Sequence, residues 1–169
     1  DTSDTLPRAP TAIAQAVAGM DILVQRDPVE ALSVADRHRR VPDRPVAARA
    51  VAEWAAGRSE LEMGDAERAV ASLRRAVELA TNGAVDDRAD RPLVARFRIS
   101  LALALAEVGR TAAALAQLRA AAPDVDADGR PRLHAQRSLV LLHAGRLREA
   151  DEAAGSAIVE AVANGDRLT

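Results

Sequence analysis

Three isolated glycines, each followed at fixed distances by alanines, limit what this chain can fold into more than any other feature. Gly64, Gly109 and Gly145 each have an alanine five residues later and another twelve residues later. Small residues recur where two helices cross, because larger side chains would hold the helices apart. The repeat therefore predicts stacked helical hairpins, each with a glycine at its turn. The residue seven positions before each glycine is small in all three cases: Gly57, Ala102 and Ser138.

A first hairpin fits the same pattern if Arg26 takes the place of the turn glycine. Gly19 then lies seven residues before the turn, and Ala31 lies five residues after it. The four turns are 38, 45 and 36 residues apart. The repeats are therefore longer and less even than the plainest helical repeat, whose period is about 34 residues.

The composition and the helix-breaking residues agree with this interpretation. Alanine, which has the highest helix propensity, accounts for 40 of the 169 residues, whereas tyrosine is absent and strand-like alternation is missing. Prolines, glycines and polar links divide the chain into eight helices. We predict an all-α fold with a flexible lead-in over residues 1–10 and one domain over residues 11–169. The four hairpins are predicted at about 11–40, 46–81, 93–122 and 132–163.

Several predicted helix ends have recognisable signals. Asp27 is predicted to cap the second helix, with Pro28 in its first turn and Glu30 completing a capping-box-like arrangement. Thr111 is predicted to cap the sixth helix. The pair at 82–83, asparagine and glycine, is predicted to end the fourth helix in a left-handed turn.

The clearest copy of the repeat is the segment MGDAERAVASLRRAVELA over residues 63–80, and here the chain resembles the tetratricopeptide-repeat family. The shared features are a small residue in the first helix, glycine at the turn and alanines at fixed offsets in the second helix. The resemblance covers nearly the whole chain after residue 10 and implies a right-handed α-solenoid of about four hairpins. The chain departs from the family in its uneven repeats and in the replacement of most of the usual tryptophan, tyrosine and proline positions.

A second resemblance concerns residues 97–126 and 132–158. These segments are similar to the amino-terminal repeats of actinobacterial CHAT-domain proteins, whose carboxy-terminal domain resembles caspase-type cysteine peptidases. The sequence contains no cysteine, so the catalytic dyad of such a peptidase cannot lie within it. Similar repeats rich in alanine, arginine and leucine also occur in actinobacterial transcriptional regulators of the ATPase type.

These resemblances imply a protein that binds rather than catalyses. The leading prediction is a noncatalytic protein–protein interaction scaffold that holds a peptide or protein segment along a concave groove. One alternative is the regulatory or substrate-recruiting region of a CHAT-type peptidase, and another is the sensor arm of a transcriptional regulator. The partner would be a separate protein or another domain of a longer parent chain.

In tetratricopeptide-like arrays, the first helices of the hairpins line the concave face that touches the ligand. Arginines on that face could bind carboxylates, because the guanidinium group forms two parallel hydrogen bonds, and a tryptophan could be an aromatic anchor. The alternative is that the arginines only solvate helix faces and that the tryptophan belongs to the core. The resemblance selects these groove residues: Met20, Leu23, Trp54, Arg58, Glu62, Arg96, Ile99, Leu103, Arg132, Gln136, Leu139 and His143.

One segment resembles the opening of a calcium-binding EF-hand loop. Asp124, Asp126 and Asp128 alternate before Gly129, as carboxylates do in such loops. The twelfth position, however, is Ala135 instead of the bidentate glutamate, and a turn between hairpins favours aspartate and glycine in any case. We therefore predict no metal site and no cofactor.

The sequence shows no catalytic group of residues. His134 and His143 are nine residues apart and would face opposite sides of one helix. Ser100 and Ser138 lie within predicted helices without the Gly-x-Ser-x-Gly turn of a serine nucleophile. The turn glycines are isolated, so they do not form a phosphate-binding loop. We predict that the chain is not an enzyme.

Charge and hydropathy exclude two further classes of partner. The 25 acidic and 23 basic residues leave a formal net charge of −2, which favours neither nucleic acid nor an anionic membrane. No apolar run approaches the roughly 18 residues needed to cross a bilayer. We predict no nucleic-acid or membrane partner and, because targeting features are absent, a cytoplasmic location.

The last predicted helix keeps an apolar face, although terminal repeats usually carry a polar capping helix. Residues 164–166 resemble another turn, and residues 167–169 resemble the start of a ninth helix. We therefore expect the chain to be a piece of a longer array, whose exposed C-terminal helix self-associates. The apolar face is formed by Leu147, Ala150, Ala154, Ile158 and Val162.

Overall fold

The computed structural model describes residues 11–83 and 91–165, which form eight α-helices and one short 3₁₀ turn, η1. No strand occurs in either described range, so the predicted all-α fold is confirmed. The predicted lead-in at 1–10 and the predicted start of a ninth helix at 167–169 lie outside the described residues. The elements are α1 (Ala12–Arg26), α2 (Pro28–Arg39), α3 (Val46–Glu62), α4 (Ala66–Gly83), α5 (Arg91–Glu107), α6 (Thr111–Ala121), η1 (Ala122–Asp124), α7 (Arg130–His143) and α8 (Leu147–Gly165).

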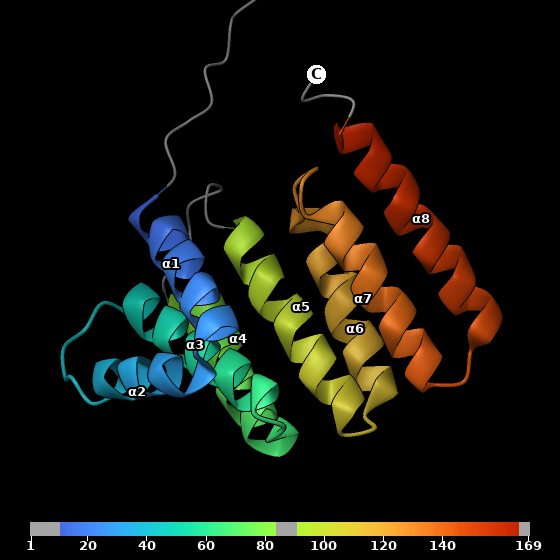
Figure 1. Cartoon of the computed structure of the whole chain (residues 1–169). Coiled ribbons are helices and arrows are strands. Elements are labelled where there is room, and N and C mark those ends of the chain that lie inside the picture. Colours follow the sequence, from blue (N-terminus) through green and yellow to red (C-terminus); the bar gives the residue numbers. More distant parts are fainter. Residues whose placement is uncertain (1–10, 84–90, 166–169) are drawn as a thin grey trace, which may run out of the picture.

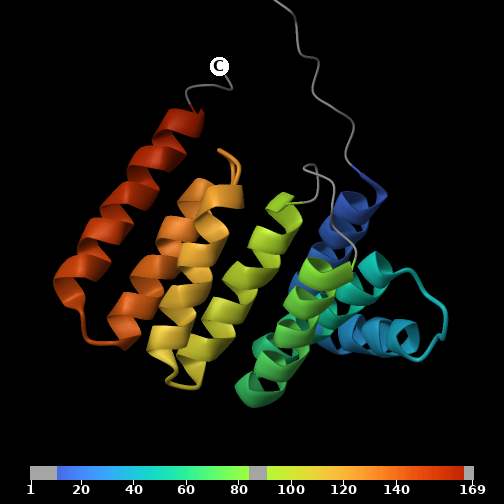
Figure 2. The same ribbon diagram turned by 180° about the vertical axis from the view of Figure 1, so that it is seen from behind.

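The helices form hairpins that follow one another along the chain (Figures 1 and 2). Helix α1 packs on α2, α3 on α4, α5 on α6 and α7 on α8, and the second helix of each hairpin contacts the first helix of the next. The first helices also contact each other, α1 with α3, α3 with α5 and α5 with α7. This packing agrees with the predicted order of hairpins. Helix α2 departs from the regular row, because it runs across the direction of its neighbours in Figure 1.

Each of the three predicted turn glycines adopts the left-handed conformation. The φ angles of Gly64, Gly109 and Gly145 are +82°, +74° and +70°. At each turn the glycine amide donates to the carbonyl three residues earlier, and the next amide donates to the carbonyl five residues earlier, over 2.8 to 3.0 Å. This pair of bonds is the Schellman motif, which satisfies the last carbonyls of a helix and favours glycine because a Cβ is strained there.

The turn of the first hairpin contains no glycine: α1 ends at Arg26, and Asp27 is the N-cap of α2. The Asp27 carboxylate accepts a 2.9 Å hydrogen bond from the backbone amide of Glu30, and Pro28 occupies the first helical position. The predicted cap is therefore confirmed. The capping box is only half formed, because the Glu30 carboxylate is directed to Arg37, at 3.6 Å.

Two predicted helix ends need correction. Helix α6 begins at Thr111 itself, its N-cap is Arg110, and no side chain caps it. The cause is the preceding Schellman turn, in which the Arg110 amide already donates to the carbonyl of Leu105 and leads directly into the helix. Helix α4 ends at Gly83, within the predicted pair at 82–83 and two residues beyond the predicted last residue, Thr81.

We expect Asp27→Ala to lower the free energy of unfolding by about 1 kcal/mol, because the Glu30 amide would lose its acceptor. Asp27→Asn should keep most of the stability, since an asparagine side chain can accept the same hydrogen bond. Urea denaturation followed by circular dichroism measures both changes. Equal losses for the two variants would show that the charge of Asp27, and not its hydrogen bond, stabilises the cap.

The predicted close crossing of the hairpin helices is confirmed in α3–α4 and α7–α8. A Cβ placed on Gly57 would lie 2.5 Å from Cγ of Leu73 and 3.1 Å from the carbonyl oxygen of Ala69. At the same repeat position, the hydroxyl of Ser138 donates to the carbonyl of Ala150 over 2.8 Å. Both crossings bring the first helix against the backbone of the second, where only a small side chain fits.

At the same repeat position, seven residues before the turn, the other two hairpins differ from each other. Ala102 has no exposed surface, in agreement with the predicted crossing of α5 and α6. A Cβ on Gly19, by contrast, would meet no atom within 4 Å, so the prediction of a crossing there is wrong. Helix α2 lies crosswise to its neighbours in Figure 1, so the first hairpin does not repeat the packing of the others.

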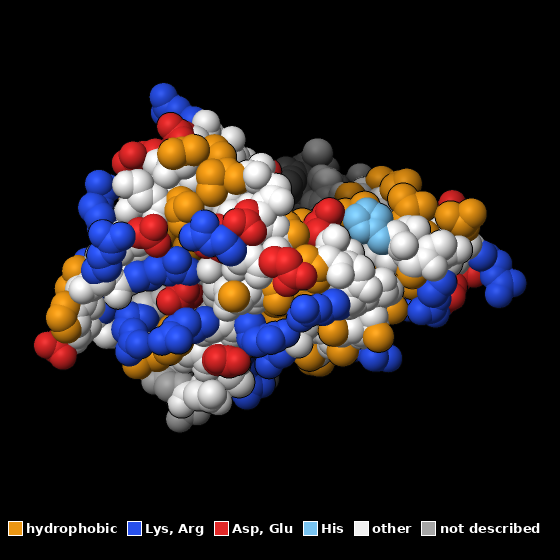
Figure 3. Space-filling view, turned by 90° about the horizontal axis from the view of Figure 1, so that it is seen from below, with side chains coloured by type: hydrophobic (Ala, Val, Ile, Leu, Met, Phe, Trp, Pro, Cys, Tyr) orange, Lys and Arg blue, Asp and Glu red, His pale blue; other side chains and the backbone are white. Residues whose placement is uncertain are grey.

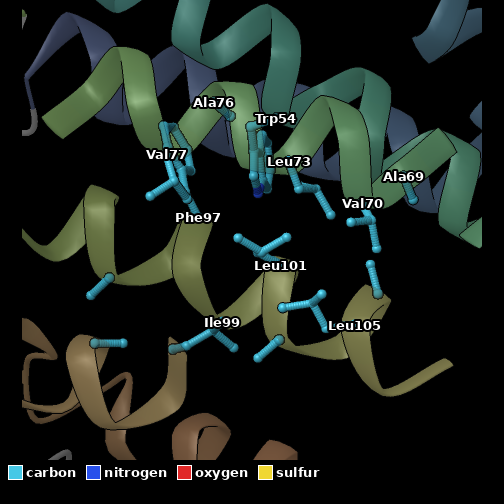
Figure 4. Packing of buried hydrophobic residues seen from close by; sticks show 14 of the residues in the cluster. Trp54, Ala69, Val70, Leu73, Ala76, Val77, Phe97, Ile99, Leu101 and Leu105 are labelled. Carbon is cyan, nitrogen blue, oxygen red and sulfur yellow. The ribbon is translucent and has the colours of Figure 1, made fainter. Parts of the chain in front are cut away.

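The main core lies between α3, α4 and α5. The rings of Trp54 and Phe97 are stacked, with centroids 5.7 Å apart and planes 23° from parallel. Figure 4 shows Phe97 and Leu101 of α5 directed toward Leu73 and Val77 of α4. All five side chains are buried. Because this layer holds both aromatic residues of the chain, the second and third hairpins form the best packed part of the fold.

The last hairpin has a small separate core of Leu141, Ala150 and Ala153. The apolar face predicted for its second helix is therefore divided: Ala150 is buried against α7, and the larger members of the face point to solvent. Self-association through this helix stays a prediction. The exposed members, with their exposed fractions, are Leu147 (65%), Ile158 (65%) and Val162 (58%).

Candidate binding face

The twelve predicted groove residues lie on the first helices of the hairpins, but they differ widely in exposure. Trp54 has no exposed surface and Ile99 is only 6% exposed, so the prediction that these two contact a ligand is wrong. Both belong to the main core, where Trp54 stacks on Phe97. Arg58 is 7% exposed, as buried as Ile99, so its prediction as an exposed ligand contact is wrong as well, whereas Glu62 and His143 are exposed. The remaining residues are half-buried: Met20, Leu23, Arg96, Leu103, Arg132, Gln136 and Leu139.

A buried polar group links α1, α3 and α5. Asp21, only 9% exposed, forms an ion pair with Arg96, which follows it by 75 residues. The Arg96 guanidinium lies over the ring of Trp54, 5.5 Å from the ring centre, and the Trp54 indole N–H donates to the hydroxyl of Ser100 over 3.0 Å. The Trp54 ring thus stabilises the position of the Arg96 guanidinium through a cation–π contact.

Three arginines from three successive first helices lie together on this face, and we call Arg58, Arg96 and Arg132 the arginine cluster. Burial lowers the pKa of Arg132, the positive charges of Arg96 and Arg58 lower it further, and the carboxylate of Asp21 opposes them. Arg58 donates to Glu62 over 3.1 Å, and the Glu62 side chain is 46% exposed. The cluster therefore places three cations against one buried carboxylate and one carboxylate at the solvent edge.

Several polar atoms of this face have no partner within residues 11–83 and 91–165. They are two buried donors, Nε of Arg58 and of Arg96, and two buried acceptors, Oδ1 of Asp21 and Oε1 of Gln136. Arg132 forms no ion pair or hydrogen bond to any described residue. Polar atoms that have left water without finding a partner cost free energy, so a ligand that supplied partners would be stabilised here.

A second buried network joins α2, α3 and α4, and the sequence analysis did not find it. Arg39 donates to Glu53 over 2.5 Å and to the Ser72 hydroxyl over 2.8 Å, and that hydroxyl donates to Glu60 over 2.7 Å. Glu60 is only 1% exposed. Because these groups bond to each other, we assign the network to holding the first two hairpins together.

Charge of both signs covers the end of the molecule where the hairpins turn, as Figure 3 shows.

In the EF-hand-like loop, the Asp126 carboxylate accepts a 2.8 Å hydrogen bond from the Gly129 amide, and Asp124 lies 3.9 Å from Arg91. These carboxylates thus bond within the chain. Over the described ranges, no three histidine, cysteine or acidic side chains are grouped to hold a metal.

None of the helices in the described part of the chain combines the length and apolar character that a membrane span requires. Comparison with known proteins gave no match to a protein-family model, to a curated protein or to a solved structure. The resemblance to tetratricopeptide repeats and to CHAT-domain proteins therefore stays a prediction. The function has to be argued from the geometry of the face.

Proposed function

We propose that this protein is a noncatalytic interaction scaffold whose face on α1, α3, α5 and α7 binds an acidic segment of a partner protein. The observation that carries the proposal is the arginine cluster, in which three guanidinium groups lie with two carboxylates, Asp21 and Glu62, and leave one positive charge in excess. A guanidinium group binds a carboxylate through two parallel hydrogen bonds, and each charge-assisted bond of this kind contributes about 1.5–3 kcal/mol.

The three arginines have different parts in this proposal. Arg132 has no partner among the described residues and is the first available donor for a ligand carboxylate. Arg96 is held by Asp21 and by the ring of Trp54, so its position is fixed before a ligand arrives. A fixed donor loses little conformational entropy on binding, which favours affinity.

Half-buried apolar side chains beside the cluster would add the contact area that a carboxylate alone does not supply. Leu103 of α5 and Leu139 of α7 are of this kind. A segment in which acidic and apolar residues alternate would satisfy both the arginines and the leucines. Such a ligand agrees with the small net charge of the whole protein, because the attraction is local.

Selection from a random peptide library displayed on phage tests this function. Peptides selected on the wild-type protein should be enriched in aspartate and glutamate, and the Arg58→Gln, Arg96→Gln, Arg132→Gln triple variant should not select them. A matched variant that replaces the exposed arginines Arg74 and Arg148 with glutamine should select the same peptides as the wild type. Peptides without acidic enrichment, or equal selection by the triple variant, would contradict the proposal.

For a selected peptide, we expect Arg132→Gln to weaken binding about tenfold, the loss of one charge-assisted contact. The free energy of unfolding should change little, because Arg132 has no partner in the described chain. Arg96→Gln should weaken binding and also destabilise the fold, since Asp21 would remain buried without its cation. Fluorescence anisotropy and urea denaturation measure the two effects, and a destabilised Arg132→Gln variant would contradict this division of roles.

A further inference from the structure

A cavity of about 350 Å³ lies between α6, α7 and α8, apart from the arginine cluster. Its floor consists of Leu118, Leu133 and Leu141, which are 3%, 8% and 1% exposed. The side chains of Arg119 and Arg137, both exposed, line it as well. The volume falls in the range of small-molecule sites, and the combination of an apolar floor with charged walls is typical of them.

The repeat explains why this space is open. When the hairpins are aligned on their turn glycines, the walls of the cavity correspond to the tight layer between α4 and α5 in Figure 4. In that layer Phe97 and Leu101 fill the space and are 2% and 3% exposed. The corresponding residues of α7 are Leu133 and Arg137. At the junction of α6 and α7, leucine and arginine thus replace the phenylalanine and leucine that fill the junction of α4 and α5.

The same replacement occurs on the opposite wall of the cavity. Val77 of α4 is 8% exposed and fills the tight layer, whereas the residue thirteen positions after the next turn glycine is Ala122, which lines the cavity. These three changes remove apolar volume from one junction, whereas the replacement of Val70 by Leu115 at the equivalent repeat position adds some. Because buried side chains normally pack with few voids, the concentration of three such changes at one place indicates a site that something fills.

The charges at the cavity are not balanced. Arg146 is held by Glu149 through two hydrogen bonds of 2.7 and 2.6 Å, so this pair is neutral as a unit. Arg119 and Arg137 have no ion pair or hydrogen bond within the described parts of the chain. The positive charge of Arg137 also acts on the carboxylate of Glu149, so the three arginines at the cavity exceed its single carboxylate by two charges. An excess of positive charge beside apolar leucines matches an anion with an apolar tail.

We propose that this cavity binds a small aliphatic carboxylate. The apolar tail would lie on Leu118, Leu133 and Leu141, and the carboxylate would bind Arg119 and Arg137 at the rim. A cavity of about 350 Å³ lies at the small end of ligand sites and suits a ligand with a short aliphatic chain. Octanoate is such a ligand, and we use it as the probe.

Isothermal titration calorimetry of the full chain with octanoate tests the proposal. We expect saturable binding of octanoate and at least tenfold weaker binding of octylamine, which has the same tail and the opposite charge. Arg119→Gln should weaken octanoate binding about tenfold, whereas Arg74→Gln should leave it unchanged, because Arg74 has the same repeat position in α4 and does not line this cavity. Equal affinity for octanoate and octylamine, or no binding of either, would overturn the proposal.

A filling variant provides a second test. Leu133→Phe with Arg137→Leu restores the residues of the α4–α5 layer, so we expect loss of octanoate binding together with an unchanged or raised melting temperature. If this variant fails to fold, Arg137→Gln keeps the volume and removes the charge, and it should bind octanoate about tenfold more weakly. Undiminished binding by the folded variant would overturn the proposal. Dimerisation that depends on Arg137, without octanoate binding, would also overturn it by making a second copy the occupant.

Discussion

Trp54→Ala is expected to lower the free energy of unfolding by about 3–5 kcal/mol, which is typical for removal of a fully buried aromatic side chain. Trp54 has no exposed surface, stacks on Phe97 at 5.7 Å and donates a hydrogen bond to Ser100. The loss should be measured by urea denaturation followed by circular dichroism, because Trp54 is the sole tryptophan and its fluorescence disappears with it.

Trp54→Phe is the matched control for this prediction. It keeps a ring against Phe97 and beneath Arg96, but it removes the indole N–H that bonds to Ser100. The Ser100 hydroxyl would still donate to the carbonyl of Arg96, 3.2 Å away, so the loss should be about 1–2 kcal/mol. A loss below about 1 kcal/mol for Trp54→Ala would contradict its assignment to the core.

The proposed function predicts a second effect of Trp54→Ala, on the binding of a peptide. Since the Trp54 ring lies beneath Arg96, Trp54→Ala should weaken the binding of a selected acidic peptide even under conditions where the variant remains folded. Trp54→Phe should retain most of the affinity, because a phenyl ring still offers its face to the cation. Fluorescence anisotropy with the labelled peptide measures both variants, and full affinity of a folded Trp54→Ala variant would show that Arg96 needs no support.

The features that the sequence predicts correctly depend on residues close together in the chain. A Schellman turn depends only on the conformation of one residue and on two nearby hydrogen bonds. The turns at Gly64, Gly109 and Gly145 all have this conformation and both bonds. The cap at Asp27 likewise involves a residue three positions away. Helical propensity and these local signals are sufficient to predict eight helices in their correct order.

Contacts between hairpins cannot be predicted from such local signals, because they depend on the angle by which each hairpin is rotated relative to the preceding one. Asp21 and Arg96 are 75 residues apart, and no local signal relates them. Trp54 and Ile99 both lie ten residues before a turn glycine, and this position is buried in both hairpins, so the resemblance assigned a core position to the face. Arg96 and Arg132 remain half-buried at the face, whereas Arg58 and Trp54 are buried.

One signal in the sequence could have revealed part of the buried network. Aligned on the turn glycines, Glu60 has the repeat position of Leu105 and Leu141, both of which are apolar. A carboxylate at a position that the other hairpins fill with leucine indicates a buried charge with partners nearby. The structure supplies them, because Ser72 donates to Glu60 over 2.7 Å and Arg68 lies 3.7 Å away.

Gly57→Val is expected to lower the free energy of unfolding by more than about 3 kcal/mol, and Gly57→Ala by about 1–3 kcal/mol. A Cβ on Gly57 would lie 2.5 Å from Cγ of Leu73, so one of the two helices has to move. Leu73 is fully buried and cannot turn away, and the Ala69 carbonyl at 3.1 Å is part of the backbone. The gain of about 1 kcal/mol in helix propensity from glycine to alanine is too small to offset this overlap.

Gly19→Ala provides the control at the same repeat position. No atom lies within 4 Å of a Cβ at Gly19, which is exposed in α1, so alanine should raise the free energy of unfolding by about 0.5–1 kcal/mol. Gly155→Ala in α8 should behave in the same way, since its surroundings are equally open. Urea denaturation compares the three alanine variants. If Gly57→Ala stabilised the protein as Gly19→Ala does, the α3–α4 crossing would be looser than the contact with Leu73 requires, and small residues at this repeat position would need another explanation.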